Sequence, residues 1–511
     1  MSTADLMLDG SGLTVDLVAK AARGAGTITI AETVWPRIDA ARAVVERYAE
    51  GDEPVYGLNT GLGGNLGHRL GRDEIAAFQV QLIRGRAVAL GPPFPTDVVR
   101  AALIARANGI AKGASGVSRP VLAMLVELLN RGVTPVVPSR GSIGAADLAP
   151  MAHMGLVLIG LGEAQVEGRV FPGREALRLA GLEPLTLGPK DGLGLINANA
   201  VTVGDAALVL SEARRLLLAA AATAALACEG YAANPSTFDA RTAALRKAPG
   251  QESAAALFRV FLKGSSLGET DAPRAIQDAL SFRCLPQIAG AAFHALAHAI
   301  AVTETELNAA ADNPAVLAED GVILSTGNFH LGALALAIDS LALALAHSAH
   351  ASMARIVKLM SATHSGLPRY LSPVGGSSAG LVPMQKAAAA LLAEIRLKAS
   401  PACLDAIAIS DFVEDHAPQA PLAVRKLDEQ FSLLARLTAI EALTAAQAVD
   451  LRKPEALGAG SRLVHAFVRA TVPTLEADRE TGAEAEDLAQ RLLAGDLAER
   501  LQGFAPSFRG V

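Results

Sequence analysis

The chain has 511 residues, 51% of them hydrophobic and only 4% aromatic, so we expect a core of Ala, Leu and Val side chains. Such a composition favours helices over sheets. The formal net charge of -6 provides no basic surface for nucleic acid or an anionic membrane, and a small-molecule substrate is the expected partner. Three scattered cysteines fit neither a disulfide framework nor a zinc site, which indicates the cytoplasm and no bound metal.

The first third of the chain is expected to alternate helices with glycine-rich turns. Residues 1–23 alternate apolar and polar positions, which predicts a short strand and a turn before a first helix over 32–48. Residues 55–63 hold too many glycines for a helix or a central strand. A helix is predicted over 75–89 and two more over 101–133, with Pro120 near the start of the second.

A glycine- and serine-rich turn over 140–147 runs into an apolar helix predicted over 148–161. Asp147 stands at the N-cap position of that helix. Gly141, Ser142 and Gly144 would leave backbone N–H groups uncovered just before it, which is a geometry suited to an anionic ligand.

The rest of the chain predicts an all-α protein with a long central helical bundle. Residues 164–174 read as a hairpin, and long helical runs follow, such as 206–227 and 292–310. The apolar run 331–345 is interrupted by Asp339 and Ser340 and is too short to span a bilayer, so we expect it to be buried in the bundle. Terminal surface helices are predicted over 476–499.

Several collinear motifs between residues 55 and 450 resemble those of the histidine/phenylalanine/tyrosine ammonia-lyase family. They include Tyr56-Gly-Leu-Asn-Thr-Gly61, Gly141-Ser-Ile-Gly-Ala-Ala-Asp-Leu148, Leu195-Ile-Asn197, Gln277-Asp-Ala-Leu-Ser-Phe-Arg283, Gly327-Asn-Phe-His330 and Val413-Glu-Asp-His416. Eight or so motifs in one order exceed what a lone short motif shows. The resemblance implies an all-α ammonia-lyase fold with a smaller loop-rich N-terminal domain, 1–205, and a helical domain, 206–511. It also implies a tetramer whose active sites are shared between chains.

The motif around residue 145 departs from the family pattern. The family's Ala-Ser-Gly cyclises into an electrophilic ring, methylidene-imidazolone, whereas only Ala145 and Ala146 stand between Gly144 and Asp147. The serine that would be dehydrated and the glycine that would attack are both missing. We therefore expect no cofactor, and the ring to be absent.

The resemblance also assigns candidate catalytic residues. Tyr56 would remove the substrate β-proton. Lys386, at a position that is apolar in the family, and Glu414 would form an acid/base pair acting on the substrate ring. For Lys386 the plainer alternative is a solvated lysine on a helix.

Candidate substrate-binding residues follow in the same way. Arg283 would hold the substrate carboxylate, and Asn197, Asn313 and Gln385 would line the site. Arg86 replaces the histidine of the family's Ser-His pair and would face a ring substituent with negative charge. The alternatives are a solvated arginine and structural asparagines.

A site without the ring would suit a leaving group that needs no activation, such as trimethylammonium. The resemblance is then to the family branch that converts ergothioneine, a thiol-imidazole betaine, to thiourocanate and trimethylamine. Two alternatives remain: a lyase or aminomutase acting on another amino acid or betaine such as hercynine, and a catalytically inert relative that binds an imidazole ligand.

Overall fold

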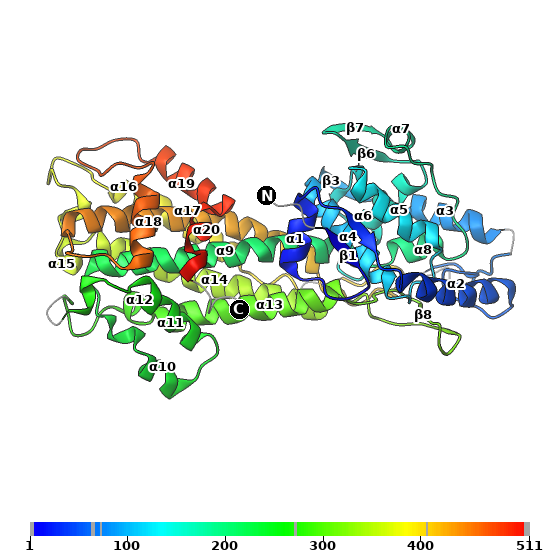
Figure 1. Cartoon of the computed structure of the whole chain (residues 1–511), viewed down its shortest axis with the longest axis horizontal. Coiled ribbons are helices and arrows are strands. Elements are labelled where there is room, and N and C mark those ends of the chain that lie inside the picture. Colours follow the sequence, from blue (N-terminus) through cyan, green and yellow to red (C-terminus); the bar gives the residue numbers. More distant parts are fainter. Residues whose placement is uncertain (1–4, 63–66, 72–73, 270–272, 405–406, 505–511) are drawn as a thin grey trace. The chain divides into compact units, whose positions relative to one another are not determined.

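Figure 1 shows the computed structural model of the chain, which describes residues 5–62, 67–71, 74–269, 273–404 and 407–504. The chain forms two compact units. The first unit comprises Met1–Ser211, Ile300–Leu336 and Pro401–Val424, and the second comprises Glu212–Ala299, Ala337–Ser400 and Arg425–Val511. The predicted boundary after residue 205 is close to the first division, and the first unit also includes two later segments of the chain.

The structure is mostly helical, as the sequence predicted. The first unit contains α1 (Val15–Arg23), α2 (Val34–Glu50), α3 (Ile75–Arg86), α4 (Thr96–Ala111), α5 (Arg119–Asn130), α6 (Leu148–Leu158), α7 (Gly173–Leu179) and α8 (Asp191–Ile196). Four of the five divisions between the units fall within α9 (Ala200–Tyr231), α13 (Leu285–Leu307), α14 (Gly332–Leu359) and α17 (Ala420–Arg452), and the fifth falls between Ser400 and Pro401.

The strands of the described residues all belong to the first unit and are short. β1 (Leu6–Leu8) pairs in parallel with β2 (Ile28–Ile30). The other pairs are antiparallel: β3 (Leu90–Pro93) with β5 (Pro138–Arg140), β6 (Glu163–Val166) with both β4 (Thr134–Pro135) and β7 (Arg169–Pro172), and β8 (Ala315–Leu317) with β9 (Val322–Leu324). The β6–β7 pair confirms the hairpin predicted over 164–174.

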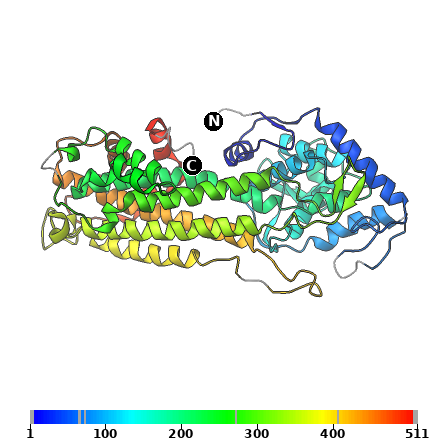
Figure 2. The same cartoon turned by 90° about the horizontal axis from the view of Figure 1, so that it is seen from below.

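The second unit is a helical bundle. Within it, parts of α9, α13, α14 and α17 run side by side and share an apolar interior (Figure 2). Its other elements are η3 (Pro235–Phe238), α10 (Ala240–Arg246), α11 (Gln251–Phe261), η4 (Ser266–Gly268), α12 (Leu280–Arg283), α15 (Ala362–Ser365), η5 (Arg369–Leu371), α16 (Val382–Lys398), α18 (Ala459–Arg469), α19 (Gly482–Ala494), α20 (Asp496–Leu501) and η6 (Gln502–Phe504).

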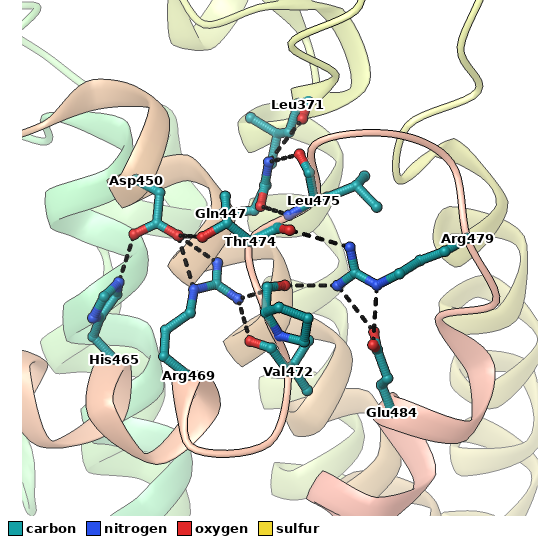
Figure 3. Close-up of polar contacts among 11 residues, drawn as sticks. Leu371, Gln447, Asp450, His465, Arg469, Val472, Thr474, Leu475, Arg479 and Glu484 are labelled. Atoms are coloured by element: carbon teal, nitrogen blue, oxygen red, sulfur yellow. Dashed lines mark hydrogen bonds and ion pairs between the residues drawn. The ribbon is translucent and has the colours of Figure 1, made fainter.

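Two polar clusters hold this bundle together. Arg355 of α14 donates through Nε to Glu441 Oε1 of α17 at 2.5 Å, and both side chains are buried. Further along α17, Asp450 accepts hydrogen bonds from His465 Nε2 at 2.7 Å, Arg469 Nε at 2.8 Å and Thr474 Oγ1 at 2.9 Å (Figure 3). The second cluster fastens α18 and the segment after it to α17.

Two local predictions were wrong. The strand and turn expected over 1–23 are β1 followed by helix α1, in which Thr14 Oγ1 accepts from Leu17 N at 3.2 Å. Val15, Val18 and Ala22 are buried along one face, and this helical spacing outweighs the short alternation. The helix expected to reach residue 161 ends at Leu158, and Gly160 follows with φ of +76°.

Three stretches are long and apolar enough to cross a membrane by length and composition: Asp191–Tyr231, Leu285–Leu307 and Gly332–Leu359. Their most apolar windows are 94%, 44% and 50% buried inside the structure, respectively. The last stretch therefore carries exposed apolar side chains such as Leu336 and Leu343. An apolar face of this kind is typical of a surface that another chain covers.

Candidate active site

Tyr56 lies on a loop that is fixed on both sides. Its neighbours Val55 and Leu58 are buried in an apolar cluster with residues of α2 and β8, and Tyr56 itself is half-buried. Gln79 of α3 donates through Nε2 to Gly57 O at 3.1 Å. Gly57 has φ of +65°, and a Cβ there would meet Leu193 Cδ2 at 2.3 Å, so glycine is required. These contacts fix the backbone of the Tyr56 loop against α2, α3 and β8.

Arg86 is the last residue of α3 and is half-buried. Burial lowers the pKa of its guanidinium, while the neighbouring Tyr56 and Glu414 side chains act in the opposite direction. An arginine on the solvated face of a helix would feel neither effect strongly. Tyr56 and Glu414, two other predicted site residues of the first unit, thus both lie within electrostatic reach of Arg86.

Glu414 is held in a tight turn. Ile409 N donates to Glu414 O at 3.0 Å, and the two residues form a β-bridge. Ser410 Oγ donates to Glu414 Oε2 at 2.7 Å, which orients the carboxylate and leaves its other oxygen for a further partner.

Asn197 and Asn313 meet in the first unit. Asn197 Nδ2 donates to Asn313 O at 2.5 Å, and Asn313 Oδ1 accepts from Thr326 N at 2.9 Å. Nearby, the buried Arg106 donates through Nη2 to Asp312 Oδ1 at 2.6 Å and also to Gly194 O. These bonds hold the end of α8 against the segment before β8, so each asparagine has a structural bond of its own.

The signature loop over 142–147 is anchored by a buried carboxylate. Asp147 accepts hydrogen bonds from Thr202 N and Thr202 Oγ1, both at 2.8 Å, and from Ser142 Oγ at 2.7 Å. Burial raises the pKa of this carboxyl, while the hydrogen bonds act to lower it. The residue stands at the N-cap position of α6 as predicted, but its side chain makes no capping bond to that helix. Gly144 N is also occupied, since it donates to Ser142 Oγ at 3.2 Å, so the predicted row of uncovered N–H groups was wrong there.

Two segments from distant parts of the chain flank this loop. On one side Ala146 N donates to Phe329 O and Leu331 N donates to Gly144 O, both at 3.3 Å. On the other side Gln419 N donates to Ile143 O at 2.9 Å. The two flanking segments carry the ends of two family motifs, and the loop therefore lies where the motifs converge.

Sequence reasoning gave no role to the histidines that end those two motifs. His330 Nε2 lies 3.0 Å from His416 Nδ1, and the ring centroids are 5.1 Å apart. Each histidine closes a motif that was quoted as a match, Gly327-Asn-Phe-His330 and Val413-Glu-Asp-His416. The only sequence signal for this histidine pair was that both motifs end on a histidine.

The remaining predicted site residues belong to the second unit. Arg283 ends α12 and donates through Nη1 to Gln277 Oε1 at 2.7 Å. Gln385 and Lys386 lie near the start of α16, and Lys386 is exposed. The pairing of Lys386 with Glu414 stays a prediction, because the two residues belong to different units. Among the described residues, no group of three or more His, Cys, Asp or Glu side chains could hold a metal ion.

Comparison with known proteins identifies the family. Residues 13–470 match the family model described as aromatic amino acid lyase. A histidine ammonia-lyase of Gloeobacter violaceus is 41% identical over 500 residues, covering 97% of both chains. A histidine ammonia-lyase of Symbiobacterium thermophilum is 39% identical over 497 residues, covering 97% of this chain and 98% of the relative.

Solved structures agree over the same length. Ergothionase from Treponema denticola, an ergothioneine degrading enzyme solved with desmethyl-ergothioneine sulfonic acid, superposes with a TM-score of 0.93 at 31% identity and covers 97% of this chain and 99% of its own. Histidine ammonia-lyase from Trypanosoma cruzi superposes with a TM-score of 0.91 at 31% identity, covering 99% of this chain and 97% of its own.

The prediction that the protein has no prosthetic group is corrected by these comparisons. The curated relatives across 97% of the chain are histidine ammonia-lyases, a class of enzyme that uses the methylidene-imidazolone ring. Ala145 and Ala146, as they stand between Gly144 and Asp147, supply neither the serine hydroxyl nor the glycine amide from which the ring is made. The residues present at this position therefore do not fit the ring.

The shared length, the collinear motifs and the common fold define what kind of enzyme this is. The family and its curated members are carbon–nitrogen lyases. The protein is a carbon–nitrogen lyase, and it belongs to the aromatic amino acid lyase family.

Proposed function

We propose that the protein removes trimethylamine from ergothioneine to give thiourocanate. The observation that carries this proposal is that Arg86 is half-buried, with Tyr56 and Glu414 within electrostatic reach of its guanidinium. A half-buried guanidinium favours an anionic partner, and the thiolate form of a thiol-imidazole ring is one. The similarity to an ergothioneine degrading enzyme over almost the whole chain supports the same substrate class.

The reaction balances with groups that the chain supplies. Tyr56 takes the proton from the β-carbon, the released electron pair forms the carbon–carbon double bond, and the carbon–nitrogen bond pair leaves with neutral trimethylamine. Arg283 would bind the carboxylate, and Glu414 with Lys386 would exchange a proton with the ring. Asn197, Asn313 and Gln385 would complete the walls of the site.

These residues come from both units, so the assembly is part of the proposal. We propose a cytoplasmic homotetramer in which Arg283, Gln385 and Lys386 of neighbouring copies complete each site. The exposed apolar side chains of α14, such as Leu336 and Leu343, support such an assembly, because contact with another copy would cover them.

The second candidate is elimination of ammonia from histidine. The curated relatives at 41% and 39% identity, both histidine ammonia-lyases, favour it. Both candidates share the β-proton transfer to Tyr56 and the carboxylate site. They differ in the leaving group and in the ring substituent, so a comparison of substrates separates them.

The test is a parallel assay of ergothioneine, hercynine and histidine with the purified protein. Ultraviolet absorbance would follow the conjugated acid, and mass spectrometry would identify the amine. We expect trimethylamine from ergothioneine at a kcat/KM at least about tenfold above that for hercynine. Ammonia from histidine as the fastest reaction would establish the second candidate and exclude the first.

The variant Arg86→His examines the role of the guanidinium. We expect it to lower the ratio of kcat/KM for ergothioneine to that for hercynine by about tenfold or more, because the cation that faces the thiolate is removed. Arg84→His is the matched control, since Arg84 is an exposed arginine on the same helix, and its ratio should not change. An unchanged ratio in Arg86→His would refute the assigned role.

A further inference from the structure

His330 and His416 form a hydrogen-bonded pair that spans the signature loop. Their ring nitrogens are 3.0 Å apart, the rings are tilted by 32°, and the residues are separated by 86 positions in the sequence. Exposed histidine rings seldom meet in this way without a reason, because each could be hydrated instead. The pair therefore requires a physical account of its own.

The hydrogen bonds define which nitrogen of each ring carries the proton. Gly332 N, which can only donate, donates to His330 Nδ1 at 3.2 Å. The neutral His330 ring must then carry its proton on Nε2, from which it donates to His416 Nδ1. It follows that residue 416 must present an acceptor at the Nδ1 position.

Each ring belongs to a segment that bonds to different residues of the signature loop. His330 forms a β-bridge with Ala145, and its neighbours Phe329 and Leu331 bond to the loop through their backbones. His416 follows Glu414 by two residues, and the same segment reaches Ile143 through Gln419 N. The hydrogen bond between the two rings therefore joins the His330 segment directly to the His416 segment.

We propose that His330 and His416 are positioning residues that set the place of the Glu414 carboxylate relative to the Gly144–Ala146 loop. This inference rests on the proposed function for the role of Glu414. The turn that holds Glu414 is short and consists of the Ile409 bridge and the Ser410 hydrogen bond. The histidine pair ties that turn to the loop, and a displacement of about 1 Å in a reacting group can cost about 100-fold in rate.

The test compares His416→Ala with His416→Asn. Asn Oδ1 lies two bonds beyond Cβ, as His Nδ1 does, so it can accept from His330 Nε2, whereas alanine cannot. We expect His416→Ala to lower kcat by about tenfold to 100-fold with KM changed less than about threefold, and His416→Asn to recover kcat to within about threefold of the wild type. His364→Ala is the control: His364 is an exposed histidine of the second unit with a hydroxyl partner, and its loss should leave kcat unchanged.

A second readout separates this inference from the proposed function. Amide hydrogen exchange at Ile409, Glu414 and Ala146 should accelerate in His416→Ala and return towards the wild-type rate in His416→Asn. If the wild type turns over none of the three substrates, the proposed function fails and the exchange data still test the pair. Wild-type kcat in His416→Ala, no recovery in His416→Asn, or unchanged exchange in His416→Ala would each overturn the inference.

Discussion

Two aspartates, Asp147 in the first unit and Asp450 in the second, each organise a cluster of hydrogen bonds, but with different partners. Asp147 is buried and bonded by a backbone N–H and by two hydroxyl groups. Asp450 receives a hydroxyl bond as well, but its main partners are His465 and the cation Arg469 (Figure 3). Burial raises the pKa of Asp147; burial also acts to raise that of Asp450, but the His465 hydrogen bond and the Arg469 charge lower it overall.

The difference indicates what each cluster is for. A cation compensates the cost of burying a carboxylate, so the Asp450 cluster stabilises the fold at neutral pH. The Asp147 carboxyl has no cation among its hydrogen-bond partners, and its bonds to Ser142 and Thr202 order the signature loop instead. We infer that the Asp147 cluster serves the reaction and that the Asp450 cluster serves stability.

The largest expected effect comes from Asp147→Ala. This change leaves Ser142 Oγ, Thr202 N and Thr202 Oγ1 without their acceptor and should release the loop. We expect kcat/KM to fall by about 100-fold or more and the free energy of unfolding to fall by about 2–4 kcal/mol. Steady-state kinetics and urea unfolding are the measurements, and a variant with wild-type kinetics would show that the loop does not serve the reaction.

The corresponding change in the second unit is Asp450→Asn. We expect activity per folded molecule to stay within about twofold of the wild type, while the free energy of unfolding falls by about 1–3 kcal/mol at neutral pH. Because the folded pKa is lowered from the usual 3.8, the stability due to the carboxylate is present above that value and is lost as the pH falls through the folded pKa.

Urea unfolding at a series of pH values checks this second prediction. The difference between wild type and Asp450→Asn should be constant from about pH 7 to pH 5 and should shrink in acid. For Asp147 the sign is reversed, since a raised folded pKa gives stability that is present below the unfolded value and is lost as the pH rises. A difference at Asp450 that grew on acidification would contradict the assignment.

Local sequence patterns predicted several of the helices, among them α2 to α6, α9 and α13, but few of the long-range bonds around the candidate site. Pro120 correctly marked the first turn of α5, and the glycine-rich run over 164–174 correctly marked a hairpin. The Asp147–Thr202 bonds join residues 55 positions apart, and the two histidines are 86 positions apart. No local periodicity contains such pairs, because side-chain partners are selected by the folded chain and not by spacing along it.

The start of the chain is a contrasting case, because a local sequence signal there does predict the helix that forms. Thr14 followed by Asp16 is a helix-start signal, and it predicts α1 better than the alternation of three apolar residues does. Among the candidate catalytic residues, the family motifs supplied Tyr56 and Glu414, whereas the electrostatic influence of both on Arg86 could be learned only from the fold.

A matched pair of threonine variants sharpens the comparison between the two clusters. In Thr202→Val, Asp147 loses one hydroxyl donor inside a site where burial already raises its pKa. We expect a loss of about 1–3 kcal/mol in the free energy of unfolding and a fall in kcat of about fivefold to tenfold. Valine keeps the shape of threonine, so an effect on kcat reports the lost hydrogen bond and not a cavity.

The smallest effect is expected for Thr474→Val, which removes the same kind of hydroxyl bond from Asp450. Here His465 and Arg469 still hold the carboxylate, so the free energy of unfolding should fall by only about 0.5–1 kcal/mol. The rate constant kcat should stay at the wild-type value, because this bond fastens the segment after α18 in the second unit, whereas Asp147 orders the signature loop of the first unit. Equal losses in the two threonine variants, by urea unfolding and by kinetics, would mean that the cation at Asp450 makes no difference, and the contrast between the two clusters would then be refuted.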